Sequence, residues 1–289
     1  MWYDAPWNSA IIKWVQTLSS PFFDFFFVTV TMMGEETFFM LVAALVFWCV
    51  NKKLGYRLVF TYLTGAFLAA SLKDLFKVPR PIGEEGITSQ RLETAEGYSF
   101  PSGHSFNATA TWLTLSTHFK KHWFSILAWL SIALVALSRL YLGVHRPVDV
   151  LGGIILGWAW VWFFGWIFER IEKSGKRWIL TIVIVPTLLT LFFMENSYAF
   201  KAAGVLVAFF VGYLVEPDWI DFKAKAPFAI QIAKLAIGLG GLFALRIFLK
   251  PLLSAFLWGD FLRYLLMGFW ITIGSTWLFQ RWWGEKSSA

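Results

Sequence analysis

Long apolar runs, separated by short polar stretches, recur along almost the whole chain. A helix needs about 20 apolar residues to cross the hydrocarbon core of a bilayer, and these runs approach or reach that length. The pattern predicts an all-α, polytopic membrane helical bundle of about nine spans. The expected spans are 36–51, 56–77, 102–118, 123–143, 148–169, 177–194, 199–216, 228–249 and 260–281.

The N-terminal stretch carries a weaker pattern. Its apolar positions between Trp7 and Leu18 are interrupted by Lys13, and the run 22–33 is too short to span comfortably. We expect an interfacial helix pair on the outer surface of the membrane. In the alternative, residues 11–33 cross the bilayer, which places the N-terminus inside and adds a span.

The composition agrees with a membrane location. Of 289 residues, 58% are hydrophobic and 15% are charged, whereas soluble domains carry about 25% charged residues. The net charge of +7 does not indicate a nucleic-acid partner, because the charges form short clusters between apolar runs. The single cysteine, Cys49, lies in an apolar run, which excludes a disulfide framework and a thiolate metal site.

The basic clusters lie in alternate loops between the expected spans. They are Lys52, Lys53 and Arg57; Lys120 and Lys121; Arg170, Lys173, Lys176 and Arg177; Lys223 and Lys225; and Arg281 and Lys286. Cytoplasmic loops of membrane proteins are enriched in lysine and arginine. We therefore expect these loops inside and the remaining ones, around 78–101, 144–147, 195–198 and 250–259, outside.

Three polar clusters are out of place in so apolar a chain. They are Lys73–Pro81 at the end of one expected span, Tyr98–His104 at the start of the next, and Ser138–Asp149 between two more. The loop charges alone place all three on the outer side. Because all three clusters are expected on the same side of the membrane, we predict that they form one site.

The residue types suit the binding of phosphate. Lys73, Arg80 and Arg139 supply cations that can neutralise the oxygens of a transferring phosphoryl group, and arginine can engage two oxygens at once. Lys73 and Arg80 are about two helical turns apart, which would put them on one face before the prolines open the last turn. Ser102 is a plausible helix cap. Gly103 has no side chain, so the backbone N–H groups at the helix start, which favour bound anions, can approach a phosphate closely.

The histidines suit the transfer itself. His145 and Asp149 are four residues apart, so one helical face can hold both. A carboxylate on one ring nitrogen fixes the tautomer and leaves the other nitrogen free to attack phosphorus. His104, on another span, can protonate the leaving oxygen and later activate water.

This constellation resembles the type 2 phosphatidic acid phosphatases, the superfamily that also includes glucose-6-phosphatase and the vanadium haloperoxidases. The family pattern is K-x6-R-P, P-S-G-H and S-R-x5-H-x3-D. It is matched at Lys73–Pro81, Pro101–His104 and Ser138–Asp149 without a departure, within a resemblance over roughly residues 20–170.

The resemblance implies a role for each matched residue. It implies a phosphohistidine at His145, oriented by Asp149, with His104 as the acid and base. It implies that phosphate is held by Lys73, Arg80, Ser102, Gly103 and Arg139. It also implies that no metal and no other cofactor is required.

The chain departs from the family in its outer parts. The usual first span looks missing or degenerate, and about 120 residues with four more spans follow the core. We expect an N-terminal interfacial helical segment at 1–35, a membrane phosphatase core at 36–170 and an additional C-terminal transmembrane region at 171–289.

The favoured function is a phosphatase of a lipid phosphate or lipid pyrophosphate, such as undecaprenyl pyrophosphate, phosphatidic acid or phosphatidylglycerophosphate. We expect it in a bacterial inner (plasma) membrane, with the site facing the periplasm. One alternative is a phosphatase of a soluble phosphomonoester, or a phosphotransferase. Another is a lipid transporter or scaffold that keeps the motif as a head-group site. The sequence indicates no oligomeric state.

Other polar residues have simpler interpretations. His118 and His122 have metal-ligand spacing but flank lysines in an expected cytoplasmic turn, which disfavours a metal. Lys234 and Arg246 are expected to extend towards head groups. The loop 83–97 is either a lid over the site or a plain solvated loop.

Overall fold

The computed structural model describes residues 2–194, 197–253 and 256–284. Lys286, a member of the last basic cluster, lies outside these ranges. Every regular element in the described residues is a helix, which confirms the predicted all-α class. Two compact units are formed, one from Met1–Met40 and Gly65–Phe163 and the other from Leu41–Thr64 and Phe164–Ala289. We call them unit 1 and unit 2; the three-part division drawn from the sequence stays a prediction.

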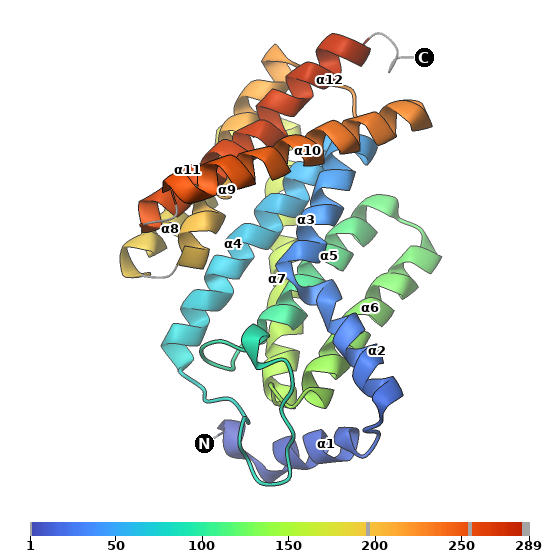
Figure 1. The fold of residues 1–289 in the computed structure, drawn as a ribbon, viewed down its shortest axis with the longest axis vertical. Coiled ribbons are helices and arrows are strands. Elements are labelled where there is room, and N and C mark those ends of the chain that lie inside the picture. The colour runs from blue at the N-terminus through green and yellow to red at the C-terminus, as the bar shows by residue number, and fades with distance from the viewer. Residues whose placement is uncertain (1, 195–196, 254–255, 285–289) are drawn as a thin grey trace. The chain divides into compact units, whose positions relative to one another are not determined.

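The helices follow the apolar runs closely (Figure 1). The principal helices are α1 (Pro6–Gln16), α2 (Pro21–Thr31), α3 (Glu36–Leu45), α4 (Lys52–Phe76), α5 (Gly103–Phe119), α6 (His122–Tyr141), α7 (Pro147–Ser174), α8 (Thr181–Leu189), α9 (Ser197–Trp219), α10 (Phe228–Leu253), α11 (Leu257–Phe269) and α12 (Ser275–Trp283). Short π-helical segments, Val46–Val50 and Trp270–Gly274, continue α3 and α11.

Some of these helices are long and apolar enough to cross a membrane. Among the described residues, α4, α6, α7, α9 and α10 are long and apolar enough to cross a membrane, and the pair Pro21–Gly34 and Glu36–Val50, bent by 55°, would make a sixth span. Helix α5 has 17 residues and is therefore about 26 Å long, short of a full crossing. The chain is a multi-pass membrane protein, and the count of nine spans stays a prediction.

The core of unit 1 lies between α5, α6 and α7. Phe106, Ile132 and Val161, one from each helix, are almost completely buried in one cluster. Helix α7 approaches α5 closely through glycine, since a Cβ atom on Gly153 would lie 2.5 Å from the Ser102 carbonyl oxygen. This close packing fixes the start of α5 against the first turns of α7.

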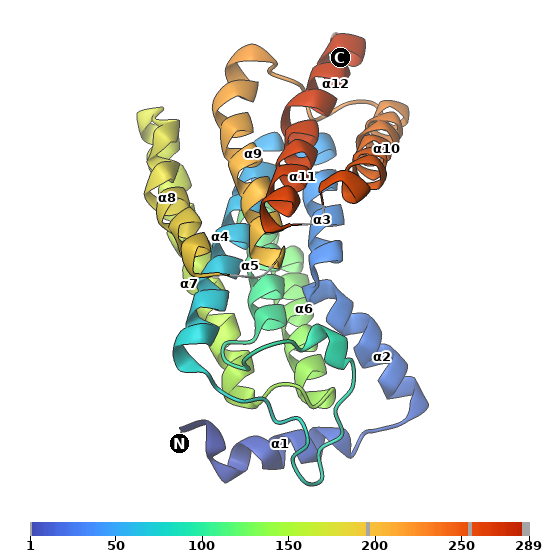
Figure 2. The same ribbon diagram turned by 60° about the vertical axis from the view of Figure 1, so that its left-hand side comes forward.

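The N-terminal segment forms two helices, as the sequence predicts. Ser20 caps α2 by accepting the Phe23 N–H at 3.4 Å, and α2 packs along α6, where the rings of Phe27 and Tyr141 lie 4.4 Å apart. Helix α1 crosses the end of unit 1 that holds the start of α7 (Figure 1, Figure 2). Its interfacial position stays a prediction, as does the ten-span alternative.

Unit 2 is held together by close contacts of small residues and aromatic rings. A Cβ atom on Gly238 would lie 2.5 Å from the Trp48 ring, and one on Gly241 would lie 2.2 Å from the Trp270 ring. Lys234 does not extend outwards as expected. It is fully buried, and its ammonium donates to the carbonyl oxygens of residues 223 and 224. The rest of α10 exposes an apolar surface, as a lipid-facing helix does.

Candidate active site

The three polar clusters meet at one end of unit 1, as the sequence predicts. The end of α4, the start of α5 and the junction of α6 with α7 lie together there, and the segment 77–102 runs between them and α1 (Figure 1, Figure 2). Backbone hydrogen bonds join them: the Ser99 N–H donates to the Val78 carbonyl at 2.8 Å, and the Ser102 N–H donates to the Asp149 carbonyl at 2.9 Å. The clusters are thus fixed relative to one another by the main chain.

His145 lies in the tight turn between α6 and α7 and is 1% exposed. The turn passes through Gly143, whose φ of 64° suits glycine. A Cβ there would also lie 2.3 Å from the Thr88 carbonyl oxygen. Helix α7 then begins at Pro147, which suits a first helical position, and Asp149 in its first turn accepts the Arg146 N–H at 2.7 Å.

A serine that the sequence analysis did not single out connects His145 to Asp149. The His145 Nδ1 lies 3.6 Å from Asp149 Oδ2, too far for a hydrogen bond. The Ser99 hydroxyl lies between them, donating to Asp149 Oδ2 at 2.5 Å and lying 3.2 Å from His145 Nδ1. Ser99 belongs to the Tyr98–His104 cluster, but its extended segment has no periodicity that could have marked the side chain.

The opposite ring nitrogen of His145 accepts a hydrogen bond from Arg80. Arg80 Nη1 lies 3.0 Å from His145 Nε2, and a guanidinium can only donate. Nε2 therefore carries a lone pair and the ring proton lies on Nδ1, where it can donate to Ser99. Carbonyl oxygens of residues 96, 97 and 144 also accept from Arg80. Burial lowers the pKa of Arg80 to about 10, so it stays charged at neutral pH.

The helix opens before Arg80, as predicted, but it opens early enough that Lys73 and Arg80 do not share one helical face. Helix α4 ends at Phe76, and Lys77 takes a left-handed conformation with a φ of 48°. Lys73 and Arg80 therefore do not share two turns of one helix. The extended segment after Lys77 carries Arg80 back over the site, because the two prolines cannot continue the helix.

The electrostatic surroundings favour a neutral His145. Burial, followed by the charges of Arg80, Arg139 and Lys73, holds its pKa well below the usual range for histidine. At neutral pH the imidazole is consequently uncharged, and its Nε2 keeps a lone pair that could act as a nucleophile once Arg80 releases it.

Arg139 and His104 present polar atoms that no group in the described part of the chain satisfies. Arg139 is fully buried; its Nη1 donates to the Thr31 hydroxyl at 2.9 Å, while its Nε and Nη2 have no partner among the described residues. The Nε2 of His104 is likewise buried and unpartnered. Leaving such groups unpaired costs about 1–3 kcal/mol each, so the arrangement favours an anion with several oxygens.

The start of α5 combines a capping serine with open space beside the next residue. Ser102 is fully buried and is the N-cap, its hydroxyl accepting from the Ser105 N–H at 3.4 Å. A Cβ atom on Gly103 would meet nothing within 4 Å. The space beside Gly103 is therefore open, and no other group of the described chain comes close to its backbone there.

The segment over the site is anchored at several points. Arg146 binds Glu84 and the Pro79 carbonyl, and Ser9 of α1 donates to the same glutamate at 2.7 Å. Arg91 forms an ion pair with Glu35 at 2.8 Å. These contacts tie the segment to both α1 and the start of α3, so it is more than a plain solvated loop.

Among the residues that the structure describes, no three His, Cys, Asp or Glu side chains gather in a way that could hold a metal ion. His118 and His122 therefore form no such group. The predicted independence of the reaction from metals is a statement about activity and stays a prediction.

Two family models match the chain. The PAP2 superfamily matches residues 54–173, and the transmembrane extension of PAP2 superfamily phosphatases matches residues 200–286. Their ranges together include all eight predicted site residues and most of the C-terminal helices.

Curated proteins and a solved structure are also similar. The dihydrosphingosine 1-phosphate phosphatase of Schizosaccharomyces pombe is 30% identical over 191 residues, which are 61% of this chain and 45% of that protein. The undecaprenyl-diphosphatase of Sulfolobus acidocaldarius is 30% identical over 141 residues, 49% of this chain and 66% of that protein. The crystal structure of Aquifex aeolicus LpxE superimposes with a TM-score of 0.51 at 26% identity, covering 56% of this chain and 96% of that one. The chain spans about half the length of the first curated relatives that it matches.

Proposed function

We propose that this chain, which belongs to the PAP2 superfamily, is a membrane phosphatase that hydrolyses a lipid phosphate or lipid pyrophosphate through a phosphohistidine. The named activities of its relatives support the substrate class, since they include phosphatases of a sphingoid base phosphate and of a polyprenyl diphosphate. The membrane setting supports it as well, because a lipid head group arrives at the depth of the helix ends.

One observation carries the proposal. A neutral, buried His145 lies among three cations, and the nearby Arg139 has two buried nitrogens without partners. A phosphoryl group bound there would satisfy the arginine and present its phosphorus to the Nε2 lone pair. Electrostatic stabilisation of the equatorial oxygens is the main requirement of phosphoryl transfer.

In the first step, Nε2 of His145 attacks phosphorus and the bond from phosphorus to the leaving oxygen breaks. His104 enters this step as the imidazolium, which the anionic substrate stabilises, and gives its proton to that oxygen, so the alcohol or phosphate leaves in its protonated form. The phosphorylated imidazole carries positive charge, which is stabilised through the chain Nδ1–H, Ser99 hydroxyl and Asp149 carboxylate. Lys73, Arg80, Arg139 and the start of α5 hold the transferring oxygens.

In the second step, His104 takes a proton from water and the water oxygen attacks phosphorus. The P–N bond breaks, inorganic phosphate leaves, and Nε2 regains its lone pair. The protons balance over the cycle, because His104 donates one in the first step and recovers one in the second.

The proposal is tested by turnover of purified protein. A panel of lipid phosphates, lipid pyrophosphates and soluble phosphomonoesters should show release of phosphate, fastest with a lipid. Faster turnover of a soluble ester would assign the enzyme to soluble substrates and would leave the phosphohistidine mechanism unchanged. Release no faster than background across the panel would favour a transporter or scaffold and overturn the proposal.

Ser99→Ala should lower kcat by about 10- to 100-fold, the usual effect of removing a group that orients a reactive histidine. Ser99→Thr keeps the hydroxyl and should recover much of the loss. Ser89→Ala is a matched control, because that hydroxyl in the same segment bonds the Gly143 carbonyl at 2.9 Å instead. Wild-type turnover in Ser99→Ala would show that Asp149 orients His145 without the serine.

Turnover should persist in excess EDTA. Lys73, Arg80 and Arg139 supply the positive charge that divalent ions supply in other phosphatases. The measurement is phosphate release before and after chelation and dialysis. Loss of activity that only an added divalent ion restores would contradict this prediction.

The proposed site faces the outside of a bacterial inner membrane, as the loop charges predict. After Cys49→Ala, an introduced cysteine at the exposed Glu85 should react with a membrane-impermeant maleimide in intact cells. One at the exposed Ser174 should react only after permeabilisation. Labelling in the opposite order would place the reaction in the cytoplasm.

A further inference from the structure

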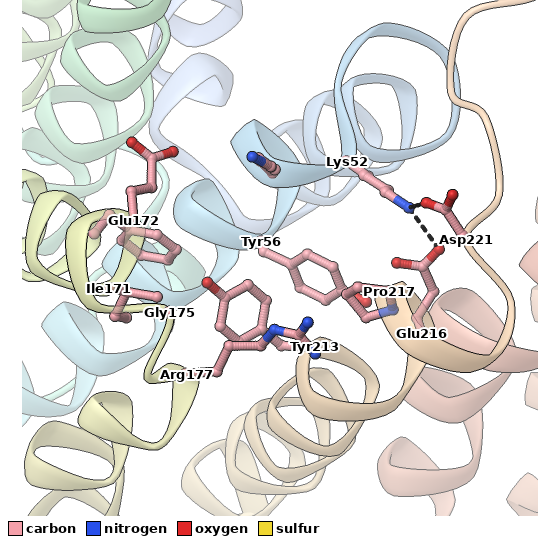
Figure 3. Close-up of a pocket in the computed structure, with 12 residues that line it drawn as sticks. Lys52, Tyr56, Ile171, Glu172, Gly175, Arg177, Tyr213, Glu216, Pro217 and Asp221 are labelled. Atoms are coloured by element: carbon pink, nitrogen blue, oxygen red, sulfur yellow. Dashed lines mark hydrogen bonds and ion pairs between the residues drawn. The ribbon is translucent and has the colours of Figure 1, made fainter.

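Unit 2 contains a pocket of about 310 Å³ that is separate from the residues of the proposed reaction (Figure 3). It lies among the first turn of α4, the last turns of α7 and the last turns of α9. Its lining includes Lys52, Tyr56, Arg177, Tyr213, Glu216 and Asp221. The volume is within the range of small-ligand sites, about 300–1,000 Å³.

Two buried polar atoms in the pocket lining have no partner. Glu216 is fully buried; its Oε1 accepts from Lys52 Nζ and from the Phe222 N–H, both at 3.0 Å, whereas its Oε2 accepts from nothing in the described chain. Tyr56 is 1% exposed and its hydroxyl is also unpartnered. Because native proteins pair nearly all buried polar atoms, these atoms indicate a ligand that brings its own donors.

Two half-buried cations of the pocket, Lys52 and Arg177, are already engaged. Lys52 Nζ bonds Asp221 at 2.8 Å in addition to Glu216 (Figure 3). The Arg177 guanidinium is held by both carboxylate oxygens of Asp218, at 2.7 and 2.8 Å. What remains inside the pocket is acceptor capacity, which suits a cation better than an anion.

Aromatic rings form the apolar part of the lining. The Tyr56 and Tyr213 rings meet edge to face with centroids 5.0 Å apart, and Phe168 meets Tyr213 in the same way at 6.0 Å. Ring faces attract ammonium groups. A primary ammonium has three N–H donors for Glu216 Oε2 and the Tyr56 oxygen, whereas a quaternary ammonium has none and would leave both oxygens unpaired.

We propose that this pocket binds a primary ammonium group, carried either by the zwitterionic head group of an ethanolamine phospholipid or by a free alkylamine. The side chains of Lys53 and Glu172 are exposed, and the Lys53 ammonium can bind the phosphate of such a head group. The site goes beyond the proposed phosphatase reaction, since none of the groups that act on phosphorus takes part in it.

The test uses purified full-length protein in detergent and measures binding by native mass spectrometry and by the thermal unfolding midpoint. The probes are phosphatidylethanolamine, phosphatidylcholine and free ethanolamine. Phosphatidylethanolamine should be retained more strongly than phosphatidylcholine. Tyr56→Phe should weaken its binding about fivefold and Glu216→Gln about tenfold or more, as expected for a neutral and a charged hydrogen bond.

Tyr56→Phe is the sharper variant, because it removes an oxygen that bonds nothing within the described chain. A purely structural tyrosine would leave lipid binding unchanged and the ligand-free midpoint equal or higher. Tyr198→Phe, at an exposed tyrosine of the same unit, is the matched control, and phosphate release should stay at the wild-type rate in all three variants.

The probes separate the two ligand sources. An equal, Tyr56-dependent shift with free ethanolamine assigns the site to soluble amines, whereas a shift with the lipid alone assigns it to the membrane. Equal retention of phosphatidylcholine, or no effect of Tyr56→Phe and Glu216→Gln, overturns the proposal. Neither result bears on the phosphatase, whose own failure would appear as absent turnover.

Discussion

His145→Ala should lower phosphate release by at least about 10⁴-fold, as expected when a covalent nucleophile is removed. The imidazole Nε2, which lies 3.0 Å from Arg80 Nη1, is the proposed nucleophile, and alanine supplies no lone pair in its place. The measurement is steady-state turnover of a lipid phosphate by purified protein. His122→Ala, at an exposed histidine at the start of α6, is the matched control and should keep full activity.

The same variant tests the intermediate. Wild-type protein mixed briefly with radiolabelled substrate and quenched in alkali should carry label that is stable at high pH and released in acid, as phosphate on a ring nitrogen is. The label should be absent in His145→Ala. Label on another residue, or activity retained in the variant, would contradict the assignment of His145 as the nucleophile.

His104→Ala should lower turnover of substrates with poor leaving groups by about 10²- to 10⁴-fold, the usual contribution of a general acid. Activated aryl phosphates should lose far less in the first step, because their leaving groups depart without a proton. Comparing an alkyl phosphate with an aryl phosphate in single turnover isolates that step. Equal losses for both substrates would assign His104 to phosphate binding rather than to proton transfer.

Most helices were predictable because each apolar run matches the length that burial in a bilayer demands. Helix α10, for example, was expected at 228–249 and runs from Phe228 to Leu253. The grouping of the clusters was predictable from loop charge, since sidedness follows from the alternation of basic loops. The count of nine spans stays a prediction, since five helices of the described residues, or six spans with the bent pair, are long and apolar enough to cross a membrane.

The features that the sequence did not predict depend on tertiary contacts. Ser99 acts through side chains 46 and 50 positions away in the chain, in a segment without regular structure. Residues 41–64 group with the C-terminal helices through contacts such as that of Trp48 Nε1 with the Ile271 carbonyl, at 3.2 Å. Neither hydropathy nor local motifs carry information on such pairings.

The hydrogen bond from Arg80 to His145 Nε2 bears on how the enzyme responds to its own product. Under the proposed mechanism, departing inorganic phosphate is replaced at Nε2 by an internal donor, so the phosphate-free site is not left with an unpaired nitrogen. Free phosphate and a lipid ester must both break that bond to bind, but only the ester has a lipid chain that adds binding energy of its own. Turnover should therefore be sustained in phosphate-rich surroundings.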